Sequence, residues 1–137
     1  MINVLQKLSL SLLLAMICLP AAVAKAADSV PERHDARQLW QAFLDDHGKA
    51  EQTLVGKTIE ISGIVVETGM SIYFTPNVRL SDAADGEILV VCVLPRSDVG
   101  LLADFKKGEK LVMSGRVYRL SPSSGAVVIK ESRRVGR

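Results

Sequence analysis

Side chains that commonly perform catalysis are few in this sequence, and their spacing is poor for it. Its two histidines, His34 and His47, both fall in or beside a segment with helical periodicity. Asp45, Asp46 and His47 could supply metal ligands, but three consecutive helical residues point in different directions. A solvated helix end is therefore the simpler interpretation, and we predict no metal site there.

Other catalytic signatures are missing from the sequence. It has no Gly-x-Ser-x-Gly motif, no phosphate-binding loop and no His-Glu-x-x-His motif. The acidic segment 82–87 lacks the alternating oxygen ligands of a calcium loop. Cys92 lies in an apolar run, where cysteine behaves as a small hydrophobe. We predict that the protein is not an enzyme and has no catalytic residue and no cofactor.

The elements that would position a binding site are mainly strands. Alternating and β-branched residues predict strands over 58–67, 71–80, 87–94, 110–120 and 126–131, with an interruption near Pro76. The third of these is apolar on both faces, which is typical of a strand covered on both sides. We expect a helix containing Trp40 to cover its outer face. Turns are predicted at 81–86 and 121–125.

Two helices are predicted. Asp35 can cap the first, whose apolar face would be Leu39, Trp40, Phe43 and Leu44. Gly48 would break it, with another turn over 50–55. Trp40, the only tryptophan, is expected to anchor this helix on the sheet rather than to hold a ligand.

The second predicted helix lies between the third and fourth strands. Ser97 would cap it and it would run over 98–107, with acidic Asp98 at its start and two lysines at its end. Gly108 suits the left-handed conformation that closes a helix.

One segment of the sequence is echoed 52 residues later. Residues 56–65 and 108–117 share a glycine turn, two inward apolar residues, a Ser-Gly pair and a valine. Glycine inside a strand usually marks a bulge or a bend, and a small closed barrel needs long strands that bend. We predict two such strands; chance similarity of strand composition is the alternative.

The N-terminal residues have the features of a secretory signal peptide. Lys7 precedes an apolar run over 8–19, Pro20 breaks that run, and Ala22-Val23-Ala24 supplies small residues for cleavage. We predict cleavage after Ala24, or alternatively after Ala26, with no transmembrane segment remaining. A membrane anchor is an alternative, although the run is short. Lipid attachment at Cys18 is another, although Ile17 is large for it.

The predicted organisation is a signal peptide at 1–24, a flexible tether at 25–34, a domain at 35–132 and a basic tail at 133–137. Without the signal peptide only Cys92 remains, so no intrachain disulfide can form. We expect the protein to be exported to the periplasm.

Charge is uneven along the chain. Residues 25–104 carry 7 basic and 13 acidic side chains, whereas residues 105–137 carry 9 basic and 2 acidic ones. The basic third can attract anionic partners. Alternatively, it is the solvated rim of a sheet and pairs with acidic parts of the same chain, which is the interpretation we favour.

Three strands, a helix and two strands follow the order of the OB-fold, a five-stranded Greek-key barrel. The sequence also resembles the tRNA-anti-like OB-fold family over roughly 39–132, in segments 44–51, 56–63, 90–93 and 102–115. The resemblance implies a mainly β fold, with the helix between strands three and four and an extra N-terminal helix. It also implies an exported protein. Asp46 and Leu54 depart from the family, which usually has Asn and Tyr there, and Ser132 stands where some relatives have a second cysteine.

OB barrels bind ligands on the face of strands two and three and on the loops joining strands 1–2 and 4–5. The residues predicted to bind a ligand are Tyr73, Arg79, Arg116, Tyr118 and Arg119. Expected partners are an envelope protein, a glycan or a small anion. Nucleic-acid binding through the basic third is the alternative, but stacking aromatics are scarce.

Overall fold

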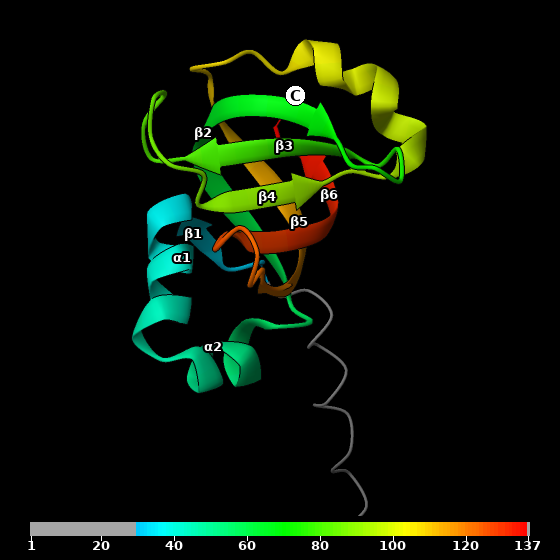
Figure 1. Ribbon diagram of the computed structural model, residues 1–137. Coiled ribbons are helices and arrows are strands. Elements are labelled where there is room, and N and C mark those ends of the chain that lie inside the picture. Colours follow the sequence, from blue (N-terminus) through cyan, green and yellow to red (C-terminus); the bar gives the residue numbers. More distant parts are fainter. Residues whose placement is uncertain (1–29, 137) are drawn as a thin grey trace, which may run out of the picture. The chain divides into compact units, whose positions relative to one another are not determined.

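A computed structural model describes residues 30–136 (Figure 1). The predicted signal peptide, its cleavage positions and Cys18 lie outside these residues. Five strands close into a barrel: β2 (Thr58–Met70), β3 (Pro76–Ser81), β4 (Val90–Val93), β5 (Lys110–Leu120) and β6 (Val127–Arg134). Their order is β2-β3-β4-β6-β5, and β2 pairs again with β5. This topology confirms the predicted OB-fold barrel.

The echoed segments pair with each other about a local two-fold axis. Ile61 lies opposite Met113, its counterpart 52 residues later, in the antiparallel β2–β5 pair. The flanking hydrogen bonds repeat with the same offset: Gly56 and Lys57 bond to Val117, while Gly108 and Glu109 bond to Val65. Gly56 and Gly108 both have a φ of 87°. Both long strands carry bulges. On β5 one of them lies at Gly115, as predicted, whereas on β2 the bulge lies at Val66 and not at Gly63.

The barrel core comes from the inward residues of every strand. Val65 on β2, Leu80 on β3, Cys92 on β4 and Ile129 on β6 are fully buried. Each alternates with a more exposed neighbour, because successive side chains of a strand point to opposite faces. The alternation therefore leaves an outer face available on β3, β4 and β6.

An N-terminal layer covers one side of the barrel. β1 (Arg33–Asp35) pairs parallel to β2, followed by α1 (Ala36–Asp45) and α2 (His47–Leu54). As predicted, Asp35 caps α1: its carboxylate accepts from the Gln38 amide, and the Gln38 side chain accepts from the Asp35 amide. The Trp40 indole Nε1 donates to the Gly125 carbonyl at 2.9 Å and joins α1 to the β5–β6 loop.

Several details of this layer correct the sequence predictions. Residues 33 and 34, placed in the tether, belong to β1 because β2 offers a free edge there. Asp46, not Gly48, separates the helices: it leaves helical geometry and caps α2 with its own side chain. Leu44 was expected on the apolar face but is exposed, since it lies at the margin of the buried stripe.

The middle of the chain also differs from prediction. The third strand, predicted over 87–94, is limited to β4 (Val90–Val93). Leu89 forms hydrogen bonds with Leu80 and Val127, but these lie outside the regular ladder. The following helix is η2 (Arg96–Asp104), a 3₁₀ helix that Ser97 does not cap and that buries no side chain. No helix lies in front of β3 and β4 in Figure 1, and α1 packs on β1, β2, β3 and β6 instead. The expected helical cover over β4 is therefore wrong.

The predicted basic tail is also partly ordered. β6 extends to Arg134, and the Val135 amide still donates to Val112. The Arg134 guanidinium forms an ion pair with Glu109 and lies over the Phe105 ring. These contacts hold the strand past the predicted boundary at Ser132.

Candidate ligand-binding face

The outward residues of four neighbouring strands form one continuous surface. The register places Arg79 opposite Val91, Val91 beside Val128, and Val128 opposite Arg119. Asn77 lies opposite Val93, one outward position along β3 and β4 from the Arg79–Val91 pair. We call the surface formed by these residues and Lys130 the outer face: Asn77, Arg79, Val91, Val93, Arg119, Val128 and Lys130. Its centre is aliphatic and half-buried, and its margins are cationic.

Two of its cations lie against an aromatic ring at the margin. Lys130 Nζ lies 3.6 Å from the centroid of the Tyr118 ring, and the Arg119 guanidinium lies 5.3 Å from it. A β-bulge between Val117 and Arg119 places Tyr118 there, because the extra residue breaks the alternation of faces. Within residues 30–136, neither Arg119 nor Lys130 forms an ion pair with a carboxylate.

The other two predicted arginines are paired. Arg79 forms an ion pair with Glu67, which lies opposite it on β2. Arg116 donates to Glu131 at 2.8 Å. Glu131 has a φ of 53°, an uncommon conformation for a residue other than glycine. Both pairs are partly exposed, so solvent and salt weaken them.

A hollow of about 480 Å³ lies at one end of the outer face. Val93, Leu94 and Pro95 form the apolar part of its lining, and Ser71, Thr75, Arg96, Lys130 and Glu131 line it as well. Asn77 also lines it, is only 6% exposed, and its Oδ1 has no hydrogen-bond partner. An unpaired buried acceptor costs about 1–3 kcal/mol, so this amide is better suited to a complex than to the free protein.

The loop beside this hollow presents large side chains to solvent. Ile72, Tyr73 and Phe74 are 84%, 69% and 75% exposed. The Ser71 hydroxyl accepts from the amides of Tyr73 and Thr75, and the Phe74 amide donates to the Ser71 carbonyl. Phe74 has a φ of 58°. The loop therefore holds a defined shape without burying these side chains.

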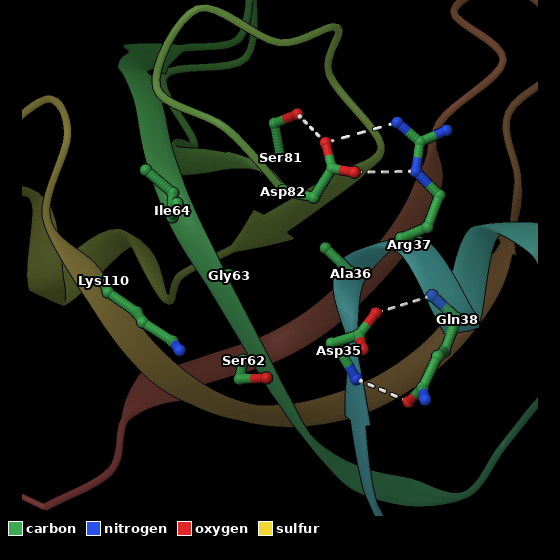
Figure 2. A pocket seen from close by; sticks show the side chains of 10 residues that line it. All are labelled: Asp35, Ala36, Arg37, Gln38, Ser62, Gly63, Ile64, Ser81, Asp82 and Lys110. Carbon is green, nitrogen blue, oxygen red and sulfur yellow. Dashed lines mark hydrogen bonds and ion pairs between the residues drawn. The ribbon is translucent and has the colours of Figure 1, made fainter.

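A second hollow, of about 450 Å³, lies where α1 meets the barrel (Figure 2). Several of its polar groups bind one another. Arg37 donates twice to the Asp82 carboxylate, at 2.9 and 3.2 Å, and Arg37 also pairs with Glu87. The hydrogen bond from Arg37 lowers the pKa of Asp82, and the same bond raises the pKa of Arg37. The Asp35 carboxylate already occupies the amino end of α1, which leaves that end unsuited to an anion.

The basic third of the chain uses part of its charge internally. Arg116 and Arg134 pair with Glu131 and Glu109, the two acidic residues of that same third. Both pairs therefore form within the basic third rather than with the acidic part of the chain. Among residues 30–136, the other basic side chains of this third form no ion pair: Lys106, Lys107, Lys110, Arg119, Lys130 and Arg133. Of these, only Arg119 and Lys130 belong to the outer face.

Cys92 is fully buried on β4. Burial raises the pKa of its thiol to about 12, although a hydrogen bond with Ser132 acts in the opposite direction. A thiol held in its protonated form is a poor nucleophile. Residues 30–136 contain no cluster of three side chains suited to hold a metal ion. In the same residues, no helix has the length and apolar character needed to cross a membrane.

The structure brings four of the five predicted binding residues together and places the fifth apart. Arg79 and Arg119 lie on one line across the sheet, with Tyr118 and Arg116 at its β5 end. Tyr73 lies apart from them, on the loop that borders the hollow. Sequence reasoning missed Asn77, Phe74 and Lys130. A polar residue directly after Pro76 in an apolar strand was the available signal for Asn77.

Comparisons with known proteins agree with this architecture. The model of the tRNA_anti-like family matches residues 5–133. A candidate nucleic acid-binding lipoprotein from Klebsiella pneumoniae has a similar structure, with a TM-score of 0.62 and 16% identity, covering 85% of this chain and 99% of its own. No curated protein sequence matches the chain.

Two further solved structures share the fold. The OBody AM3L09, solved bound to hen egg-white lysozyme, has a TM-score of 0.52 and 16% identity over 80% of this chain and 99% of its own. A candidate aspartyl-tRNA synthetase from Leishmania major Friedlin has a TM-score of 0.50 and 13% identity, over 87% of this chain and 23% of its own.

Proposed function

Because the chain belongs to the tRNA_anti-like family of OB-fold proteins, we propose that it is an exported, non-enzymatic binding module whose ligand site is the outer face. One observation carries this proposal. Arg79, Val91, Val128 and Arg119 form an uninterrupted line across four strands. α1 and η2 contact β3, but no helix lies in front of β3 and β4 in Figure 1. Half-buried valines between cations can contact a ligand along its length.

The proposed export depends on the sequence of residues 1–24. The lipoprotein nature of the Klebsiella neighbour is consistent with export. Intact-mass measurement of the secreted form tests it: a mass that begins at residue 25 or 27 supports cleavage, whereas a mass that retains Met1 contradicts it.

A photo-crosslinking experiment tests the site itself. The photoreactive residue p-benzoylphenylalanine is placed at position 91 or 128 of the full chain in cells, and at position 49 of α2 as a matched control. We expect light-dependent adducts from positions 91 and 128 that position 49 does not give, whatever the class of ligand. Equal labelling at all three positions would contradict the proposed site.

Nucleic-acid binding is the second candidate, and one observation favours it. The exposed rings of Tyr73 and Phe74 could stack on bases, as aromatic residues do in single-strand binders. The Klebsiella neighbour is likewise named for nucleic-acid binding. A single-strand binder should lose affinity steeply as salt rises. We expect a dissociation constant for oligonucleotides of about 10⁻⁴ M or weaker near physiological salt, and submicromolar affinity would promote this candidate.

A further inference from the structure

The centre of the outer face is aliphatic. Val91, Val93 and Val128 lie side by side on β4 and β6 and are half-buried in the free protein. Single-strand nucleic acid binders place aromatic rings where bases stack, and none of the outward residues between Arg79 and Arg119 is aromatic. A row of valines instead fits the apolar side chains of a protein segment.

The Tyr118 ring, at the margin of the outer face, already contacts two cations. Lys130 Nζ lies 3.6 Å from the Tyr118 centroid and Arg119 lies 5.3 Å from it. A base could stack on that side of the ring only by displacing the lysine. Tyr118 therefore serves to hold the two cations beside the valines.

Charge complementarity points to acidic side chains in the ligand. Glu67 and Glu131 neutralise Arg79 and Arg116, whereas Arg119 and Lys130 have no carboxylate partner among the described residues. The two free cations border the valine row on β5 and β6. A segment that alternates apolar and acidic side chains would satisfy both features.

The hollow at the end of the face adds a main-chain contact. Asn77 Oδ1 lacks a donor. Val93, Leu94 and Pro95 give the lining an apolar part, which lies in the same hollow as the charged Arg96, Lys130 and Glu131. The terminal torsion of asparagine is broad, so its amide can turn toward a ligand. The N–H group of an extended peptide is such a donor, and Ile72 and Phe74 stand exposed beside it.

We propose that the outer face binds an extended, acidic segment of a partner protein, whose apolar side chains lie on Val91, Val93 and Val128 and whose carboxylates bind Arg119 and Lys130. This inference rests on the proposed function and specifies its ligand. It names a class of sequence, alternating apolar and acidic, that can be synthesised and tested directly.

The test is fluorescence anisotropy with labelled probes and the protein in its secreted form. The probes are a decapeptide alternating leucine and glutamate, the same decapeptide with lysine for glutamate, and a ten-nucleotide thymidine strand. We expect the acidic peptide to bind at least tenfold more tightly than the other two probes. Arg119→Glu should weaken the acidic peptide about tenfold, and Lys49→Glu, the same charge change on α2, should alter it less than twofold.

Val91→Asp provides a second perturbation of the face and should also weaken the acidic peptide about tenfold. Circular dichroism is the control for folding. If Val91→Asp unfolds the protein, the effect of the exposed change Arg119→Glu on peptide affinity is the test. Equal binding of the two peptides, tighter binding of the thymidine strand, or no binding of the acidic peptide up to about 1 mM would each overturn the peptide proposal. Adducts at positions 91 and 128 would then still support the outer face as a site for another ligand class, whereas their absence would remove both proposals.

Discussion

The two ends of the β2–β5 pair are built from the same short sequence but are covered differently. At one end, Ser62, Gly63, Ile64 and Lys110 line the hollow of about 450 Å³ beneath α1. At the other, the residues offset by 52, Ser114, Gly115, Arg116 and Thr58, line a hollow of about 390 Å³. The first is bordered by the N-terminal layer, and the second by Pro95, Asp98 and the end of β6.

This difference in covering distinguishes a hollow that joins two parts of the fold from a surface that could bind a ligand. Beneath α1, Arg37 binds Asp82, and Asp35 binds Gln38. At the other end, Arg116 and Glu131 form an ion pair. Glu131 and Pro95 also line the hollow of about 480 Å³ at the end of the outer face, where Asn77 Oδ1 has no hydrogen-bond partner. The hollows of about 450 and 480 Å³ differ little in volume, so the pairing of their polar groups distinguishes them better than volume does.

The two equivalent glycines should respond unequally to added volume. A methyl group at Gly115 would lie 2.5 Å from Ile129 Cγ2 and 2.9 Å from the Lys130 carbonyl oxygen, whereas at Gly63 the nearest atom, Leu80 Cβ, is at 3.1 Å. We expect Gly115→Ala to lower the free energy of unfolding by about 3 kcal/mol and Gly63→Ala by about 1 kcal/mol. Urea denaturation measures both, and equal losses would show that the two ends are packed alike.

The titration of Cys92 tests whether the core behind the outer face is packed as closely as the rest of the core. Its pKa rises from 9.0 to about 12 on folding, so the folded state holds the proton more tightly than the unfolded state. Its contribution to stability should be fully present below pH 9 and fall above it, by about 1.4 kcal/mol per pH unit, until the folded thiol ionises. Cys92→Ala should abolish this alkaline loss in urea denaturation.

The same thiol gives a kinetic readout. We expect a thiol reagent at pH 8 to label Cys92 only after denaturant is added, because the side chain has no exposed surface. Rapid labelling of the native protein would mean that β4 and β6 separate readily and that the uncovered half is the looser one.

Trp40 tests how strongly the N-terminal layer is attached. Trp40→Phe keeps most of the apolar contact but removes the hydrogen bond to the Gly125 carbonyl. We expect a loss of about 0.5 kcal/mol, at the low end because water can replace the indole at this exposed carbonyl. Thermal unfolding measures it, and no change would indicate that packing alone attaches α1.

The smallest expected effect concerns the ion pair in the covered hollow. Arg37 lowers the pKa of Asp82 below 3.8, so its contribution to stability is present above pH 3.8 and is lost as pH falls through the lower folded pKa. Asp82→Asn should reduce the loss of stability at acid pH while leaving the other carboxylates to titrate. An unchanged acid transition would show that solvent screens the pair completely.

Short-range signals in the sequence predicted much of the fold. The span of β5, the capping by Asp35 and the left-handed Gly108 follow from alternation and from residue preferences that act within a few positions. The limits of β4 and the helical form of η2 depend on which strands lie beside them, which no local pattern contains. The Trp40 helix was assigned to the wrong face for the same reason.

The sequence suggested two residues of the candidate site, Arg79 and Arg119, because they fall on or beside the face that OB barrels use for binding. Only the register shows that two valines connect them. The bulge that exposes Tyr118 and the missing partner of Asn77 are tertiary facts. The exposure of Phe74 follows from a loop whose conformation is set by Ser71.

The position of β6 has a consequence for the timing of folding. This strand lies between β4, to which it is parallel, and β5, to which it is antiparallel, so the barrel cannot close before residues 127–134 are present. A nascent chain that ends before Val127 can form only an open sheet, and closure depends on contacts between distant residues, which form slowly. For a protein proposed to cross a membrane before it folds, late closure keeps folding from competing with translocation.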